Sequence, residues 1–222
     1  MKKVFKIVML FFVLLLGVFM LLKTIASFQM TRYLEDKYDQ EFVVDKKRYD
    51  FINGKFYIVV HPKIDPSLSF RTMDGYGDFK YVDYYLEELW VKQVEKDYSP
   101  FITKYFPDFK RFNAKTVYGT GMEQVSSGDI PNYKDARPTL SLVIRFDQEA
   151  DERINEEFYQ KVFLLVQKIQ KDQSKIELSF LFKSEEEKDG QKPDLPFFTI
   201  SPVQMKSIKS IEDVMLIFRS IR

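Results

Sequence analysis

The sequence predicts an α+β fold: an N-terminal transmembrane helix, then a mixed antiparallel-sheet-plus-helices extracytoplasmic region, built as one body or as two small α+β subdomains. Three observations predict this class. Residues 7–22 form an unbroken apolar run. Apolar and polar residues alternate in 67–73 and 175–182, as in half-buried strands. Residues 155–171 instead repeat apolar positions every three or four residues, as in an amphipathic helix.

The apolar run predicts a membrane-spanning helix. Its sixteen residues rise about 24 Å as a helix, while a bilayer core of about 30 Å needs roughly 20 residues. Flanking lysines can extend toward the headgroups and so close this gap. The predicted span includes Ile7, Leu14, Gly17 and Leu22, and its flanks carry Lys2, Lys3, Lys6 and Lys23.

Two alternatives to an uncleaved anchor stay open, a cleaved signal peptide and a buried core helix. A signal peptide has an apolar stretch of about 7–15 residues and small residues before its cleavage site. The length of the run is at the upper edge of that range. The best cleavage site would have Thr24 and Ala26 at its small positions, but Thr is a poor match there. Lys23 also interrupts the residues that lead to this site. We therefore favour the anchor. No Cys follows the run, which excludes a diacylglyceryl lipoprotein anchor.

The charges around the run predict its orientation. Three lysines and the amino terminus precede it, whereas Lys23 and Arg32 on the far side are soon countered by Glu35 and Asp36. By the positive-inside rule, the N-terminus lies in the cytoplasm. The predicted localisation is the cell membrane, single-pass, with the bulk of the chain extracytoplasmic.

The composition excludes several classes of chemistry. The 222 residues include no Cys, so disulfides, thiolate metal sites and cysteine catalysis are impossible. Instead, 22 Phe and 13 Tyr supply material for a large core. Residues 1–23 hold four Lys and no acid, which leaves 34 − 4 = 30 basic and 33 acidic side chains beyond them, a balance of −3. This balance argues against a nucleic-acid partner and against strong docking on anionic lipid. No cofactor is predicted.

Residues 1–30 are predicted as a cytoplasmic stub, anchor and stalk, and residues 31–112 as a first α+β subdomain. This subdomain opens with a short helix at 31–38 that continues from the membrane. Its long helix begins at Asp83, restarts at Pro100 and ends at Pro107. Between the helices we predict strands at 41–44, 55–60 and 67–73.

Residues 113–222 are predicted as a second α+β subdomain. The strand at 139–146, the helix at 155–171 and the strand at 175–182 form a βαβ-like order. Ser210 and Asp213 resemble a capping box that opens a final helix. The remaining predicted segments are strands at 114–118 and 197–200 and loops at 126–138 and 183–194.

Five motifs are candidates for chemistry, and each is better explained by structure. His61 is the single His, at a strand end, with no nucleophile motif and no second His for a metal. Residues 74–78, Asp-Gly-Tyr-Gly-Asp, lack the calcium-loop pattern. Residues 118–121 contain G-x-G without the third Gly of a dinucleotide site. The acidic runs at 87–88 and 185–187 are typical of solvated faces. No catalytic, cofactor-binding or metal-binding residue is predicted.

Residues 33–44, Tyr-Leu-Glu-Asp-Lys-Tyr-Asp-Gln-Glu-Phe-Val-Val, contain the pattern Tyr-Leu-x-x-Lys-Tyr followed by Phe-x-Val. With residues 82–86, Val-Asp-Tyr-Tyr-Leu, and the later Trp90 and Gln93, this pattern resembles uncharacterised membrane-anchored extracytoplasmic proteins of Gram-positive bacteria. The resemblance covers about residues 1–105. It implies an exported, membrane-tethered protein in which the two tyrosines pack and Lys37 faces water. It carries over no activity and no catalytic residue.

We therefore expect a non-enzymatic membrane-anchored protein that binds an envelope partner: a protein, a wall polymer, or a toxin for which it confers immunity. Two alternatives stay open. One is a cell-wall- or lipid-directed hydrolase that uses dispersed carboxylates. The other is an accessory or sensor subunit of a membrane complex, although Gly17 alone offers no G-x-x-x-G face for tight helix pairing.

Overall fold

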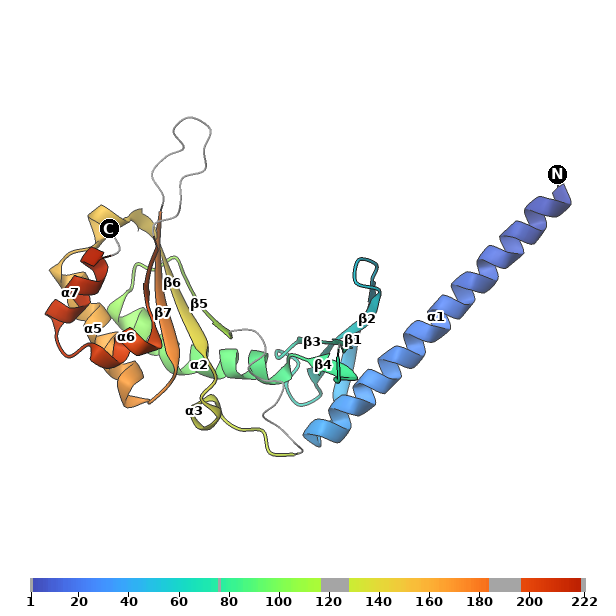
Figure 1. The fold of residues 1–222 in the computed structure, drawn as a ribbon, viewed down its shortest axis with the longest axis horizontal. Coiled ribbons are helices and arrows are strands. Elements are labelled where there is room, and N and C mark those ends of the chain that lie inside the picture. The colour runs from blue at the N-terminus through green and yellow to red at the C-terminus, as the bar shows by residue number, and fades with distance from the viewer. Residues whose placement is uncertain (1, 76, 117–127, 184–196, 221–222) are drawn as a thin grey trace. The chain divides into compact units, whose positions relative to one another are not determined.

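The computed structural model describes residues 2–75, 77–116, 128–183 and 197–220 (Figure 1). The chain divides into two compact units, Met1–Glu88 with Gly121–Ile130, and Leu89–Thr120 with Pro131–Arg222. Each unit contains one four-stranded sheet, and helices accompany both sheets, as the α+β class predicts. The division falls inside the long helix α2 (Tyr85–Tyr105), whereas the sequence places the boundary after that helix, at 112/113.

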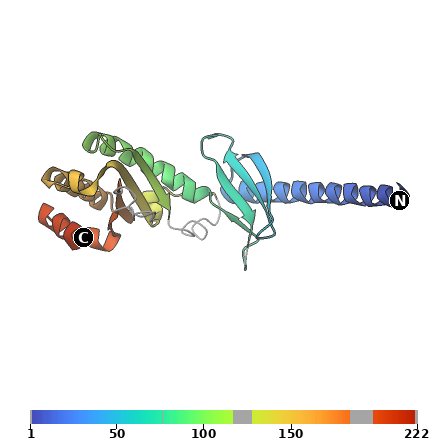
Figure 2. The ribbon, with the colours of Figure 1, turned by 90° about the horizontal axis from the view of Figure 1, so that it is seen from above.

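The first unit begins with one long helix, α1 (Lys2–Tyr38), which runs unbroken through the apolar run, the stalk and the predicted short helix (Figures 1 and 2). Within the described part of the chain, this one helix is long and apolar enough to cross a membrane. Its large apolar side chains up to Val18 are exposed, whereas Met30, Leu34 and Tyr38 are buried. A spacing of four residues places these three side chains on one face of the helix.

The sheet of the first unit is an antiparallel meander in the order β1-β2-β3-β4. Its strands are β1 (Phe42–Asp50), β2 (Lys55–Pro62), β3 (Phe70–Asp74) and β4 (Tyr81–Asp83). β1 extends well beyond the predicted 41–44, through a bulge at Asp45 and three exposed cations, residues 46–48. The sequence gives no alternation there because this edge strand exposes most of its side chains. The three-residue β4 is too short to predict from periodicity.

Aromatic rings join α1, the sheet and α2 in the first unit. Tyr38, Phe42, Phe70 and Tyr85 are buried, and their ring centroids lie 4.6 to 6.2 Å apart in five contacting pairs. Edge-to-face pairs of this kind stabilise a fold by about 0.5–1.5 kcal/mol each beyond the area that they bury. Part of the aromatic content therefore forms core, as predicted.

The sheet of the second unit is mixed, in the order β5-β6-β7-β8. β6 and β7 pair in parallel and the outer pairs are antiparallel. The helix α5 (Glu156–Lys171) connects the parallel strands, so the predicted βαβ-like order is a parallel βαβ unit. The strands are β5 (Arg111–Thr116), β6 (Leu140–Glu149), β7 (Ile176–Lys183) and β8 (Phe197–Ile200). The short helices are α3 (Tyr133–Ala136), α4 (Ala150–Arg153), α6 (Pro202–Ser207) and α7 (Ile211–Ser220).

The core of the second unit lies between one face of this sheet and the helices α2, α5 and α7. Every second residue is buried from Leu140 to Phe146 in β6 and from Ile176 to Phe182 in β7. Phe158 of α5 lies at the centre, with five ring centroids 5.3 to 6.0 Å away, those of Phe106, Phe146, Phe180, Phe182 and Phe218. The predicted inner face of α5 is confirmed, because Phe158, Val162, Leu165, Val166 and Ile169 are all buried.

Two predictions about the long helix are wrong. α2 does not restart at Pro100 but runs through it. Proline removes one backbone donor from a helix, and buried side chains on either side, Val94, Tyr98 and Ile102, hold the helix together here. α2 also does not begin at Asp83, which ends β4. The Asp83 carboxylate accepts a 3.3 Å hydrogen bond from the backbone N–H of Tyr85 and so precedes the helix as a cap.

Candidate functional site

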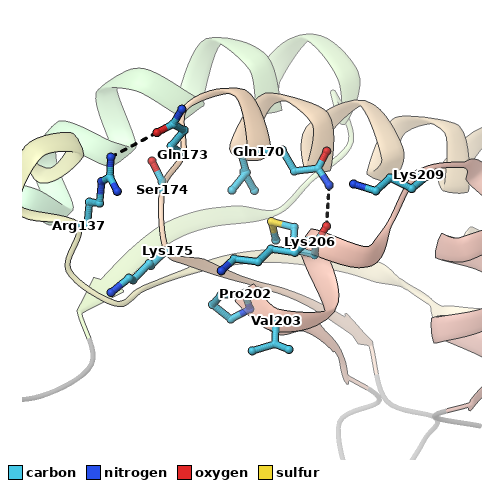
Figure 3. A pocket seen from close by; sticks show the side chains of 11 residues that line it. Arg137, Gln170, Gln173, Ser174, Lys175, Pro202, Val203, Lys206 and Lys209 are labelled. Carbon is cyan, nitrogen blue, oxygen red and sulfur yellow. Dashed lines mark hydrogen bonds between the residues drawn. The ribbon is translucent and has the colours of Figure 1, made fainter.

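The second unit contains an open groove of about 610 Å³ (Figure 3). It lies between the end of α5, the start of β7, α6 and the turn after α3. A groove of this size can accept a small molecule or a short segment of a larger one. Its lining consists of Arg137, Ile169, Gln170, Gln173, Ser174, Lys175, Pro202, Val203, Met205, Lys206 and Lys209.

One wall of the groove is shaped by two residues with left-handed backbone. Arg137 (φ 50°) follows α3, and Gln173 (φ 52°) follows α5. Non-glycine residues adopt this conformation rarely, and here each one turns the chain sharply into a β-strand segment. The Arg137 guanidinium donates a 3.3 Å hydrogen bond from Nη2 to Gln173 Oε1. This contact joins the two turns, and Figure 3 shows Arg137 near Lys175 at one end of the groove.

The floor of the groove is fixed by contacts between α5 and α6. Ile169 and Met205 are buried beneath it. Gln170 Nε2 donates hydrogen bonds to the carbonyl oxygens of Met205 (2.6 Å) and Ile208 (3.0 Å). These carbonyls lie at the end of α6, where the Met205 carbonyl also accepts a 3.4 Å hydrogen bond from the Ile208 backbone N–H. α6 begins with a capping box between Ser201 and Gln204, which the sequence analysis did not identify.

The described residues that line the groove carry positive charge only. Among them are four cations, Arg137, Lys175, Lys206 and Lys209, and no carboxylate. No ion pair joins any of the three lysines to an acid within residues 2–75, 77–116, 128–183 and 197–220. Lys206 extends along the groove toward Lys175, and Lys209 lies at the opposite end from Arg137 (Figure 3). A concave surface lined by one sign of charge attracts ligands of the opposite sign.

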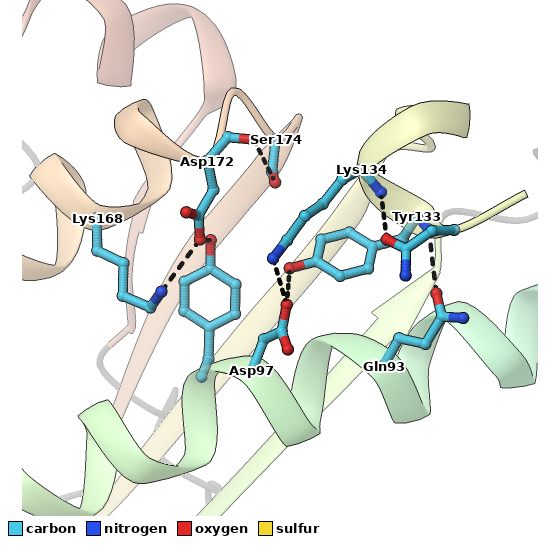
Figure 4. A network of polar contacts seen from close by, with 9 residues as sticks. Gln93, Asp97, Tyr133, Lys134, Lys168, Asp172 and Ser174 are labelled. Atoms are coloured by element: carbon cyan, nitrogen blue, oxygen red, sulfur yellow. Dashed lines mark hydrogen bonds and ion pairs between the residues drawn. The ribbon is translucent and has the colours of Figure 1, made fainter.

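A network of tyrosines and carboxylates holds the wall of the groove in place (Figure 4). Asp172, the residue before Gln173, accepts hydrogen bonds from the Tyr98 hydroxyl (2.9 Å) and the Lys168 ammonium (3.1 Å). Burial and the charge of Asp172 raise the pKa of Tyr98 well above its ordinary value. The phenol therefore stays protonated and donates, which fastens the end of α5 to α2.

The second half of this network fastens α3 to α2. Asp97 accepts a 2.8 Å hydrogen bond from the Tyr133 hydroxyl and forms a 2.6 Å ion pair with Lys134. Partial burial opposes ionisation of Asp97, yet the hydrogen bonds from Lys134 and Tyr133 outweigh it and lower the pKa of this carboxyl. The Tyr133 backbone N–H also donates to Gln93 Oε1 (3.0 Å). The two halves together position the turns that bear Arg137 and Gln173.

The first unit has a polar centre at Asp83 that the sequence analysis missed. Its carboxylate is 2% exposed and accepts hydrogen bonds from Tyr38 (2.6 Å) and Tyr33 (3.1 Å). Lys37 Nζ lies 2.9 Å from the same group. Burial, followed by the charge of Asp83, raises the pKa values of Tyr33 and Tyr38 beyond the range of an exposed phenol. The centre binds α1 to the end of β4.

Asp83 explains part of the pattern that carries the resemblance. In Tyr-Leu-x-x-Lys-Tyr, both tyrosines and the lysine contact Asp83, and Leu34 is fully buried. Asp83 itself belongs to the second segment, residues 82–86, so the two segments meet in space. The expectation that Lys37 faces water is wrong, because its side chain is 14% exposed and paired with a buried carboxylate.

The structure places the other candidate residues in structural roles. His61 lies in β2, with Nδ1 3.1 Å from Asp45 Oδ2 on the neighbouring strand. Asp74 Oδ2 accepts a 2.8 Å hydrogen bond from the Phe56 backbone N–H, which ties it to β2. Gly75 has no room for a side chain, because an added Cβ would lie 1.8 Å from the Phe79 carbonyl oxygen.

Several predicted motifs fall outside the described residues. Tyr76, the G-x-G segment 118–121 and the acidic run 185–187 belong to this group. Glu87 and Glu88 are adjacent on α2, and Glu87 is buried, so this pair is not simply a solvated face. Within the described residues, no cluster of three or more His, Cys, Asp or Glu side chains could hold a metal ion.

The residues that the sequence predicts to span or flank a membrane all lie in α1. Ile7, Leu14 and Leu22 are exposed, and a Cβ added at Gly17 would meet no atom within 4 Å. Lys3, Lys6 and Lys23 lie on either side of these residues in the same helix. The side-chain surroundings of Lys2 are outside the described part of the chain.

Comparison with known proteins gives one structural neighbour. No protein-family model matches the chain, and no curated protein matches it. A crystal structure of a DUF5037 family protein from Ruminococcus gnavus aligns with a TM-score of 0.41 and 16% sequence identity. The alignment covers 87% of this chain and 98% of the other.

Proposed function

We propose that the protein is a non-enzymatic, single-pass membrane protein that binds a phosphate-bearing envelope polymer in the groove of its second unit. The observation that carries the proposal is the set of four cations in that groove, with no acid among the lining residues that the structure describes. The N-terminus lies in the cytoplasm, residues 7–22 cross the bilayer, and the rest of the first unit and all of the second unit lie outside.

The membrane part of the proposal rests on α1. The large apolar side chains of α1 from Val4 to Val18 are exposed, and a bilayer is the environment in which such a surface is stable. Lysines precede the apolar run at Lys3 and Lys6, which favours a cytoplasmic N-terminus.

The class of ligand follows from how the charges are distributed. The cations are spread along an open groove and do not converge on one point, which suits a chain with repeating negative charges (Figure 3). Lysine binds phosphate oxygens as a flexible point charge, and three of the four cations are lysines. The apolar side chains of Pro202 and Val203 offer contact to the uncharged part of a repeating unit. A hydrolase would instead need two carboxylates in one cleft, and the described lining has none.

The experiment measures binding of fluorescent inorganic polyphosphate to the full chain in nanodiscs of neutral lipid. Neutral lipid removes competition from anionic headgroups. We expect the double variant Lys175→Gln, Lys206→Gln to bind about tenfold more weakly, since exposed charges contribute up to about 1 kcal/mol each. Binding should also weaken as salt concentration rises, because the groove is open to solvent.

A matched control is the double variant Lys115→Gln, Lys171→Gln. Both residues are exposed in the second unit and do not line the groove, so the net charge changes equally. Unchanged binding by this control supports the groove as the site. Equal loss in both double variants, or no binding by the parent protein, would overturn the proposal. Tighter binding of a polyglutamate peptide than of polyphosphate would reject the polymer in favour of an acidic peptide.

A further inference from the structure

The tip of the β1–β2 hairpin exposes two large apolar side chains. Phe51 is 82% exposed and Ile52 is 94% exposed, in the turn between Asp50 and Lys55. Exposed apolar residues at the end of a polar hairpin are costly in water and indicate contact with an apolar partner.

The same hairpin tip contacts the apolar part of α1. The Phe19 ring lies 5.5 Å from the Tyr49 ring, 5.9 Å from Phe56 and 6.5 Å from Phe51, with the last pair stacked. Phe19 belongs to the apolar run 7–22, four residues or about 6 Å before Lys23. The end of the hairpin therefore lies beside the proposed membrane-spanning segment.

The lengths of helix and hairpin agree with this placement. Phe42 packs on Tyr38 at the other end of the hairpin, with ring centroids 6.2 Å apart. From Tyr38 back to Phe19 the helix rises about 28 Å. From Phe42 to Phe51 a strand covers about 30 Å. β1 thus runs back along α1 until its end reaches the level of Phe19.

We propose that the tip of the β1–β2 hairpin inserts Phe51 and Ile52 into the outer leaflet of the bilayer, at the Lys23 end of the apolar run. The tip would be a second membrane contact of the first unit. This inference rests on the proposed membrane anchoring by α1. If residues 7–22 lie in hydrocarbon, Phe19 lies just inside its edge, and rings in contact with Phe19 share that depth. We take lipid to be the partner that contacts the apolar tip, because the tip is continuous with the proposed lipid-facing surface of α1.

Polar groups at the hairpin limit how deeply it inserts. Asp50 Oδ1 accepts hydrogen bonds from the backbone N–H groups of Ile52 (2.9 Å) and Asn53 (3.2 Å), so the turn needs little water. The Asp50 charge holds the turn at the headgroup boundary, where only the two apolar side chains go deeper. Residues 46–48, Lys-Lys-Arg, are exposed and lie about 13–20 Å back from Ile52 along the strand, toward the lipid phosphates.

The test uses the absence of native Cys. Single variants Ile52→Cys, Ile64→Cys and Leu14→Cys of the full chain carry an environment-sensitive fluorophore in liposomes with and without quencher-labelled lipid. Ile64 is a matched control, because it is an apolar residue of the same unit, 86% exposed, beyond the opposite end of β2. Leu14 reports on the anchor itself.

We expect a blue shift and lipid quenching at residues 14 and 52, and neither at residue 64. An aqueous signal at 52 with a lipid signal at 14 overturns the hairpin inference and leaves the anchor intact. Lipid signals at both 52 and 64 also overturn it, because the tip would then have no special contact. An aqueous signal at 14 rejects the anchor, and the hairpin inference with it. A blue shift at residue 52 without quenching by lipid would mean that the tip packs against protein, in the same chain or in a second copy, and would reject lipid as its partner.

Discussion

The Tyr38 hydroxyl donates a 2.6 Å hydrogen bond to Asp83 Oδ1 and so joins the end of α1 to the end of β4. Tyr33 and Lys37 reach the other oxygen of the same carboxylate from the same helix. Three contacts from one helical face to one buried acid give α1 a defined attachment to its sheet. The end of α1 is therefore fixed to the sheet of the first unit by polar contacts as well as by apolar packing.

Replacing this acid should destabilise the first unit. The change Asp83→Asn leaves the Lys37 ammonium partly buried without its counter-charge, which should cost about 3 kcal/mol. Urea unfolding of the full chain in detergent micelles, followed by hydrogen exchange of amides in β2 and β3, measures the loss. Asp36→Asn is the control, because Asp36 pairs with Arg32 at the surface and contributes at most about 0.5 kcal/mol. Equal stability of the two variants would contradict the role of Asp83.

The second unit should lose stability at alkaline pH. Burial and neighbouring acids raise the pKa values of Tyr98 and Tyr133 above the ordinary value of 10. The folded state then holds these protons more tightly than the unfolded state. Stability is complete below about pH 10 and falls above it by up to about 1.4 kcal/mol per pH unit for each phenol.

The change Tyr98→Phe tests this pH dependence. It removes the hydrogen bond to Asp172 and should cost about 1 kcal/mol at pH 7. Above pH 10, however, the variant should lose stability less steeply, since one titrating phenol is gone. The double variant with Tyr133→Phe should flatten the curve further. Denaturant titrations between pH 7 and 11 measure the slopes, and an unchanged slope in both variants would refute the explanation.

Gly75 should tolerate no side chain. In Gly75→Ala the new methyl group would overlap the Phe79 carbonyl oxygen, so the turn between β3 and β4 must move. We expect a loss of about 2 kcal/mol or more in unfolding free energy. Gly17→Ala is the control, since its Cβ meets nothing within 4 Å and Ala favours a helix. Equal unfolding midpoints would show that the turn relaxes freely.

Phe158 should contribute more to the second unit than any exposed apolar residue. Phe158→Ala removes the ring at the centre of five aromatic contacts and should cost about 3–5 kcal/mol. Leu216→Ala on the exposed side of α7 should change stability by less than about 0.5 kcal/mol. Trp90 fluorescence during urea unfolding measures both. A small effect at Phe158 would mean that the core repacks around the lost ring.

Local patterns predicted the elements that bury one regular face. The spacing of apolar residues predicts both α5 and β7. The buried residues recur every three or four positions in α5 and every second position in β7. The second half of β1 was missed because three consecutive cations stand on an exposed edge strand, where periodicity carries no signal. The predicted restart of the helix at Pro100 is wrong because buried side chains on both sides outweigh the local preference of proline.

The sites depend on residues that are far apart in the chain. Asp83 and its partners on α1 are separated by 45 to 50 positions, so neither segment alone reveals a buried ion pair. The cationic side chains that line the groove come from three separate segments, at residues 137, 175 and 206–209. Each looks like an ordinary surface cation in the sequence, and only the fold places them along one groove whose described lining has no acid. The apolar run is different, because a membrane span is encoded in consecutive residues.

Cysteine labelling of intact cells tests most directly whether a membrane-anchored chain presents its folded units outside. The chain has no native Cys, so Lys171→Cys and Lys3→Cys each provide a single thiol. With a membrane-impermeant maleimide, we expect residue 171 to be labelled in intact cells, on a full-length chain in the membrane fraction. Residue 3 should be labelled only after permeabilisation. The reverse pattern, or a shorter labelled chain released into the medium, would contradict the anchored, outward-facing arrangement.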